Sequence, residues 1–172
     1  SFISNNANGS VSSNIFALGF ITASQALSLN SKQSDDSKII YASIETTDAN
    51  TLATTLPTSS ANKFSITLSG TSAAATDLTT LLGTIDSTVS ILAGNIATIT
   101  GTTGEMATFI GSVSRFTNNN GTARAESNYT FTPSSSSQSA SDLNSLNSSV
   151  TNISLANVNT ISSSSLSDLA TL

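Results

Sequence analysis

The chain has 172 residues, and it contains 36 serines and 26 threonines but only ten acidic and five basic residues. The net charge of −5, with no cluster of lysines or arginines, argues against binding to nucleic acid, whose phosphates require basic patches. Histidine and cysteine are both absent, which excludes the common catalytic triads, disulfides and His/Cys zinc sites. We therefore expect a protein that is not an enzyme and that holds no cofactor and no metal.

The first 38 residues stand apart from the rest of the sequence, because no repeat is visible in them. Within them, residues 15–29 are apolar and uncharged, and we expect that they either cover an exposed end of a second copy or form a buried first strand or helix. The candidate contacts for self-association in this stretch are large and apolar: Ile15, Phe16, Leu18, Phe20 and Ile21.

Strand-like segments follow at intervals along the chain. Their signals are β-branched and aromatic residues, alternation of apolar with hydroxyl side chains, and a turn at Ala93-Gly94-Asn95 between two of them. The predicted strands are 38–45, 64–68, 89–91, 96–99, 129–132 and a last apolar set between 150 and 161.

Five short segments share one pattern, in which an acid is followed by an apolar residue, two small residues and a second apolar residue. The acids lie at spacings of 29, 28, 37 and 26 residues, and they are Asp48, Asp77, Glu105, Asp142 and Asp168. An acid in the first turn interacts favourably with the helix dipole, and apolar residues three apart share one helix face. Each segment is therefore predicted to begin a short helix, and spacings of this size are typical of repeat arrays.

Alternating strands and short helices predict parallel strands joined by right-handed crossovers. We interpret residues 39–172 as a repeat domain of the α/β class, a small solenoid of short strands and short helices, with a loop insertion at about 117–140. Gly70-Thr71 and Gly101-Thr102 are expected at equivalent strand ends. The alternative is an irregular mainly-β domain with antiparallel strands and a few helical turns.

The last repeat begins at Asp168 and stops at Leu172, although a solenoid normally ends in a polar capping unit. We expect that a neighbouring subunit or a continuing chain covers this end. Leu169 and Leu172 are therefore further candidate contacts for self-association.

Residues 64–81 and 96–110 each read as an alternating strand, a Gly-Thr pair, small residues and an acid followed by spaced apolar residues. This pattern resembles the Ser/Thr-rich strand–Gly-Thr–helix repeats of very large secreted surface proteins of bacteria, notably marine cyanobacteria and some proteobacteria. The resemblance covers residues 46–116 well and 138–172 loosely, and it does not cover residues 1–38. It implies an exported protein with a surface-layer or filament-like role, and it brings no catalytic residue.

Composition and the length of the apolar runs also predict where the protein is located. A neutral, hydroxyl-rich surface without cysteine favours an extracellular or cell-surface location, with a virion surface as the alternative. The chain begins at Ser1, which indicates a processed product or an excised piece. The most apolar run, residues 15–21, is far shorter than the roughly 20 residues that a membrane-spanning helix needs, so we expect no membrane insertion.

These observations predict an extracellular structural subunit that self-associates into a surface filament, layer or virion appendage, with copies of the same chain as partners. The alternative is a carbohydrate- or surface-binding module of a larger adhesin, with a glycan or another surface protein as partner and with aromatic side chains grouped on one face. Of five N-x-S/T sequons, those at Asn120 and Asn128 are the candidates for glycosylation if the protein is exported.

Overall fold

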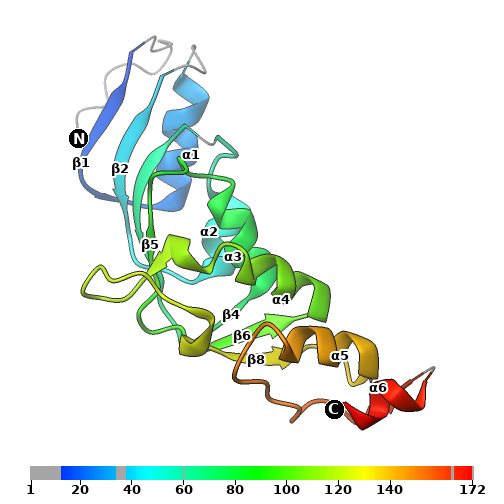
Figure 1. Cartoon of the computed structure of the whole chain (residues 1–172). Helices are drawn as coiled ribbons and strands as arrows, with labels where there is room; N and C mark the ends of the chain where they lie inside the picture. The colour runs from blue at the N-terminus through cyan, green and yellow to red at the C-terminus, as the bar shows by residue number, and fades with distance from the viewer. Residues whose placement is uncertain (1–12, 34–37, 60, 164, 172) are drawn as a thin grey trace.

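The computed structural model describes residues 13–33, 38–59, 61–163 and 165–171 (Figure 1). Within these residues the chain forms ten β-strands, six α-helices and two short 3-10 helices, η1 (Val113–Arg115) and η2 (Glu126–Asn128). All named strand pairs are parallel, and no sheet closes into a barrel in the described part of the chain. The protein therefore has a mixed α/β fold, as predicted.

The larger sheet has five strands in the order β1-β2-β3-β5-β7. Strand β2 shows why the sequence forms a strand here: Ile40, Ala42 and Ile44 are buried, and the residues between them are half-buried. This alternation is what a pleated strand with one buried face requires. The five strands are β1 (Ile15–Ile21), β2 (Ile40–Ile44), β3 (Lys63–Thr67), β5 (Ile91–Leu92) and β7 (Phe116–Thr117).

A second, three-stranded sheet has the order β4-β6-β8. Each of its strands follows a strand of the larger sheet along the chain: β4 (Ser72–Ala74) follows β3, β6 (Thr98–Gly101) follows β5, and β8 (Thr130–Pro133) follows β7. A separate parallel pair consists of β9 (Ser137–Ser139) and β10 (Thr160–Ser162).

The six helices of the described residues form one row in which each helix contacts the next (Figure 1). Helices this short are marginal alone, so packing against neighbours has to stabilise them. Polar side chains also link them, since Asn50 donates to Asp77 of the next helix at 3.4 Å and Asn144 donates to the carbonyl of Asp168 at 2.8 Å. The helices are α1 (Ala23–Lys32), α2 (Ala49–Thr55), α3 (Ala75–Leu82), α4 (Thr103–Ile110), α5 (Ala140–Asn147) and α6 (Leu166–Ala170).

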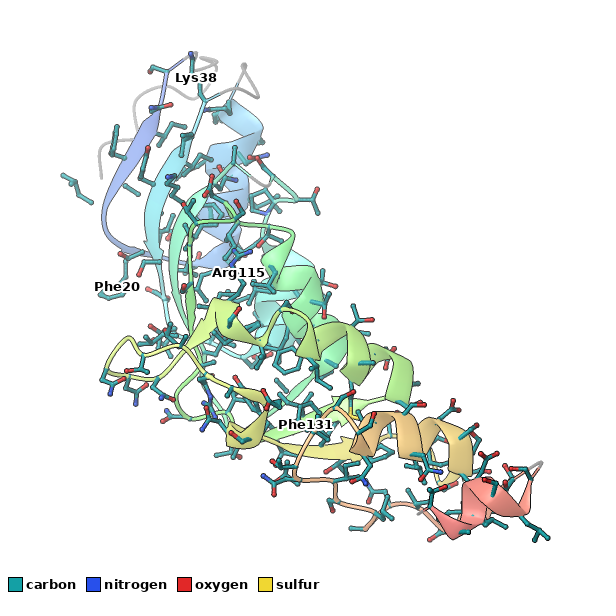
Figure 2. The ribbon with its side chains drawn as sticks, in the orientation of Figure 1. Phe20, Lys38, Arg115 and Phe131 are labelled. Carbon is teal, nitrogen blue, oxygen red and sulfur yellow. The ribbon has the colours of Figure 1, made fainter. Side chains whose placement is uncertain are left out.

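The core lies between the helix row and the sheets. Helices α1 to α5 each bury apolar side chains spaced three residues apart. The aromatic part of this core is centred on Phe109 of α4, whose ring centroid lies 5.3 Å from that of Phe116, 5.5 Å from that of Tyr129 and 6.3 Å from that of Phe131. Phe131 is labelled in Figure 2. These contacts join α4 to both sheets.

The structure differs from the sequence prediction in three places. The irregular mainly-β alternative does not describe this fold, because parallel strands alternate with helices throughout. The predicted division between residues 1–38 and 39–172 falls inside one sheet, because β1 pairs with β2 and α1 contacts α2. Residues 117–140, expected as a loop insertion, contain β8 and β9, so the stretches outside the strands are residues 118–129 and 134–136.

The two Gly-Thr pairs are also not equivalent. Gly70-Thr71 precedes β4, whereas Gly101 is the last residue of β6. The register between these strands pairs Ala74 with Thr100, so Gly101 corresponds to the residue after β4 and not to Gly70. Pairing between distant strands sets this correspondence, and the similarity of two dipeptides does not reveal it.

Candidate functional site

One candidate surface is the edge of the larger sheet at β1. Phe16, Leu18 and Phe20 are 64%, 93% and 72% exposed, and Phe20 is labelled in Figure 2. The predicted contacts Ile15 and Ile21 are instead half-buried and pack against the core. The register with β2 shifts between Phe16 and Phe20, where Gly19 has a φ of +84°. Glycine adopts this left-handed conformation without strain, so the strand bulges there and leaves Leu18 in solvent.

The outer face of the same sheet carries an aromatic pair. The rings of Phe16 and Tyr41 are stacked, with centroids 4.6 Å apart and planes inclined by 6°. Lys63 is the next residue in the register after Tyr41, so a row of two aromatic side chains and one cation crosses three strands. This row places aromatic groups on one partly exposed face.

A second apolar surface lies at the opposite end of the helix row (Figure 1). All residues of β10 are exposed, and α6 buries no residue among those described. The exposed large apolar side chains at this end are Leu155, Ile161, Leu166 and the predicted contact Leu169. Leu172, the other predicted contact, lies outside the described residues.

Exposed large apolar side chains are confined to these two ends. Among the described residues, none is found between Leu27 of α1 and Leu155. Large exposed apolar patches on soluble proteins usually mark interaction sites. The ends of the row therefore differ in chemistry from its sides.

The chain protects one edge of the larger sheet with its own residues. Beside β7, Thr117 forms an antiparallel bridge with Ala123, and the Arg124 amide donates to the Phe116 carbonyl at 2.8 Å. Beside β1, the sole strand partner among the described residues is β2. Because unpaired strand edges are templates for association, β1 combines two features of an interface: exposed apolar side chains and an edge that no second strand of the described residues covers.

The five predicted acids all lie at helix starts, in two different positions. Asp48 is the N-cap of α2, where its carboxylate accepts hydrogen bonds from the Thr51 amide at 2.9 Å and the Thr51 hydroxyl at 2.7 Å. These hydrogen bonds from Thr51 lower the pKa of Asp48. The other four acids are each the third residue of a helix: Asp77, Glu105, Asp142 and Asp168.

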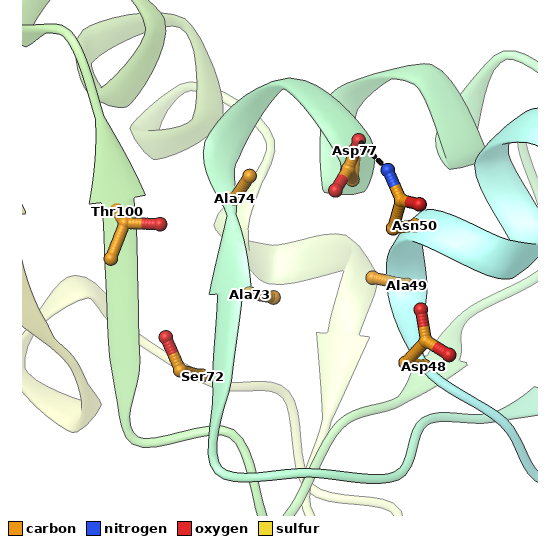
Figure 3. A pocket seen from close by; sticks show the side chains of 8 residues that line it. All are labelled: Asp48, Ala49, Asn50, Ser72, Ala73, Ala74, Asp77 and Thr100. Carbon is orange, nitrogen blue, oxygen red and sulfur yellow. Dashed lines mark hydrogen bonds between the residues drawn. The ribbon is translucent and has the colours of Figure 1, made fainter. Parts of the chain in front are cut away.

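Two shallow hollows lie between consecutive helices. One of about 180 Å³ is lined by side chains of α3 and α4, among them Glu105. No three His, Cys, Asp or Glu side chains come together to hold a metal ion in the described part of the chain. In the second hollow, Asp77 accepts a hydrogen bond from Asn50. This second hollow of about 190 Å³ (Figure 3) is lined by Asp48, Ala49, Asn50, Ser72, Ala73, Ala74, Asp77 and Thr100.

The difference between the two acid positions has a measurable consequence. Asp48→Ala should lower the free energy of unfolding by about 1 kcal/mol, because it removes the side-chain cap of α2. Asp142→Ala should lower it less, because Ser139 still caps α5 and only an exposed dipole interaction is lost. Urea denaturation measures both values, with Asp48→Asn as the control that keeps an acceptor. Equal losses for the two alanine variants would contradict these roles.

Arg124 is a buried group that the sequence analysis did not single out. It is 6% exposed, its guanidinium carbon lies 4.2 Å from the ring centroid of Tyr129, and it donates to the carbonyls of Ala93 and Asn128. Tyr129 is 1% exposed, its hydroxyl has no hydrogen-bond partner among the described residues, and burial raises its pKa to about 12. The sequence does carry one signal for Arg124: the chain contains only two arginines, so each of them stands out.

The two predicted glycosylation sites lie between β7 and β8, and both residues are exposed. Asn120 lies at the tip of the hairpin closed by Thr117 and Ala123, and its Oδ1 accepts from the Thr122 amide at 3.0 Å. Asn128 is the last residue of η2, and its Oδ1 accepts from the Ala125 amide at 2.9 Å.

No family model, curated protein or solved structure matches this chain. Across the described residues, none of the helices has the length and apolar character needed to cross a membrane. Function therefore has to be inferred from the surfaces of the molecule itself.

Proposed function

We propose that this chain is a non-catalytic, extracellular structural subunit whose copies associate end to end into a surface filament, layer or virion appendage. The supporting observation is the confinement of exposed large apolar side chains to the two ends of the helix row. One end presents a sheet edge with Phe16, Leu18 and Phe20, and the other presents β10 and α6. Because the two ends differ, each contact leaves a free end on both partners, and the assembly grows as an open filament when the rotation between copies does not close a ring.

The architecture that underlies this proposal is a small α/β solenoid. The spacings between consecutive N-cap residues are 26, 26, 28, 37 and 26, and the one long spacing contains the hairpin excursion after β7. In a stack of such coils, neighbours bury each other's faces, and the first and last faces remain open. The N-cap residues are Thr22, Asp48, Ala74, Thr102, Ser139 and Ser165.

Assembly can be tested by blocking each end separately. The triple variant Phe16→Ser/Leu18→Ser/Phe20→Ser blocks one end, and the double variant Leu166→Ser/Leu169→Ser blocks the other. By light scattering and negative-stain electron microscopy at physiological salt, the wild-type chain should form open assemblies, and each variant alone should be monomeric. Thr80→Ser, an exposed change in the middle of the row, should assemble like the wild type.

A mixture of the two blocked variants separates this arrangement from other modes of association. Each variant retains one intact end, so the mixture should form one-to-one complexes and nothing longer. A wild-type chain that remains monomeric would overturn the proposal, and dimers formed by either variant alone would show a contact between like ends. Circular dichroism of both variants checks that the exposed substitutions leave the fold intact.

The extracellular location has its own test. Antibodies raised against the chain should label intact cells or particles of its source without permeabilisation. If the chain is exported through a glycosylating compartment, the exposed Asn120 and Asn128 should carry N-linked glycans. Peptide mass spectrometry detects these glycans. Labelling that requires permeabilisation would contradict the location.

A second candidate function is a carbohydrate- or surface-binding module of a larger adhesin. It is favoured by the stacked pair Phe16 and Tyr41, which lies on the same sheet face as Ser43 and Ser65. Aromatic faces beside hydroxyl groups suit the apolar and polar sides of a sugar ring. A glycan array should then detect binding that Tyr41→Ala removes and Leu166→Ser/Leu169→Ser retains. A monodisperse monomer that binds no glycan would exclude this second function as well.

A further inference from the structure

We propose that Asn120-Gly121 is a site of spontaneous deamidation in the folded protein. The pair lies at the tip of the hairpin whose base is closed by the bridge between Thr117 and Ala123. Asn120, Gly121 and Thr122 are all exposed, so water surrounds the reacting residues.

The reaction needs only these residues and water. Solvent base removes the amide proton of Gly121, and the nitrogen forms a bond to Cγ of Asn120. The bond from Cγ to Nδ2 breaks, and this nitrogen leaves as ammonia after taking a proton from water. Water then opens the cyclic succinimide at one of its two carbonyls and leaves aspartate or isoaspartate at position 120.

The hairpin supplies a donor where the reaction develops negative charge. The Thr122 amide donates to Oδ1 of Asn120 at 3.0 Å. When the Gly121 nitrogen attacks Cγ, the charge develops on this same oxygen. The Thr122 N–H is therefore placed as an oxyanion donor, and a donor already in position requires little reorganisation during the reaction.

The attacking nitrogen is poorly shielded, because it belongs to a glycine. Gly121 has a φ of +81°, and no heavy atom lies within 4 Å of the position where a Cβ would stand. Its amide donates to the Asn118 carbonyl at 2.8 Å, so this hydrogen bond has to open before the attack. Asn118 and Asn119 are each followed by asparagine, whose side chain hinders the same attack, and they are controls within one hairpin.

The product changes the hairpin in three ways. It adds a carboxylate at the tip, and the isoaspartate form lengthens the backbone by one methylene group. Asn119 packs so closely on Gly94 that a Cβ at Gly94 would collide with its side chain, so a longer backbone displaces a tight contact. Conversion also destroys the N-x-T sequon, so glycosylation and deamidation exclude each other at Asn120.

The test uses the full, unglycosylated chain from a bacterial host, incubated folded and, in parallel, unfolded in urea. Peptide mass spectrometry and an isoaspartate-specific enzymatic assay follow each asparagine over time, at neutral and mildly alkaline pH. We expect conversion at Asn120 in the folded chain, faster at higher pH, with Asn118 and Asn119 intact. A folded-state rate below about a tenth of the unfolded rate, equivalent to about 1.4 kcal/mol of protection, would overturn the proposal.

Two variants keep the result interpretable. Asn120→Ser should lose the reaction at this peptide altogether. Gly121→Ala should slow it about tenfold, a barrier increase of about 1.4 kcal/mol. Alanine is strained at this φ, so the same variant is also measured in urea, where no turn exists. Conversion of Gly121→Ala at the wild-type rate in urea would contradict the attack by this nitrogen.

Discussion

Replacing Phe109 by alanine should lower the free energy of unfolding by about 3–5 kcal/mol, the usual range for deleting a buried aromatic side chain. Phe109 is 0% exposed, and its ring contacts three other aromatic rings, those of Phe116, Tyr129 and Phe131. The alanine variant loses the apolar burial and leaves a cavity where α4 meets both sheets. Because whole domains are stable by only about 5–15 kcal/mol, this loss is a large share of the total.

Urea denaturation followed by circular dichroism measures the effect. Thr108→Ala, on the exposed face of the same helix, should change the stability by no more than about 0.5 kcal/mol. Phe109→Leu keeps most of the buried volume and should fall between the two. A loss below about 1 kcal/mol for Phe109→Ala would mean that the aromatic cluster is not packed as described.

Alkaline pH should destabilise the protein through Tyr129. Burial raises the pKa of Tyr129 from 10.0 to about 12, so its phenol is neutral in the folded state at pH values where the unfolded chain has ionised it. The stability contribution is fully present below pH 10 and is lost as the pH rises towards 12. A difference of two pH units corresponds to about 2.7 kcal/mol.

Tyr129→Phe isolates this effect, because the two proteins differ only in the Tyr129 hydroxyl. The variant should be at least as stable as the wild type at neutral pH, since the hydroxyl that it removes is buried and has no hydrogen-bond partner in the part of the chain that the structure describes. Above pH 10 the wild type should lose stability relative to the variant. Parallel pH curves for the two proteins would contradict the burial of this hydroxyl.

The hairpin after β7 also bears on the proposed association of copies. It places Ala123 and Arg124 alongside β7. The Arg124 side chain stabilises this arrangement by donating to the carbonyls of Ala93 and Asn128. This covered edge discourages pairing with another sheet, whereas β1 has no such cover among the described residues. Self-protection at one edge of the sheet is therefore consistent with a single adhesive edge at β1.

Local pattern in the sequence was sufficient for several elements. β-branched and aromatic residues predicted β2, alternation of apolar and hydroxyl residues predicted β3, and the acids with apolar residues three apart predicted helices α2 to α6. These signals work because a strand or helix must present one apolar face to the core. The helix α1 had a readable signal as well, the capping box of Thr22 and Gln25, but it lacks the acid that marked the others.

Other elements depend on partners that are distant in the sequence. β4 and β9 consist of small or polar residues with little intrinsic preference for a strand, and they are strands because a neighbour in register supplies their hydrogen bonds. Arg124 is buried because the chain folds it between Tyr129 and two carbonyls. None of these contacts is visible in the residues next to them.

The apolar surface at β1 was likewise predicted in part from the sequence and decided in part by the tertiary structure. Composition identified residues 15–21 as an apolar segment, but it left open whether they form a buried strand or an exposed contact. The tertiary structure decided this residue by residue, because neighbouring side chains of a strand point to opposite faces. Pairing with β2 turned Ile15 and Ile21 towards the core and left Phe16, Leu18 and Phe20 in solvent.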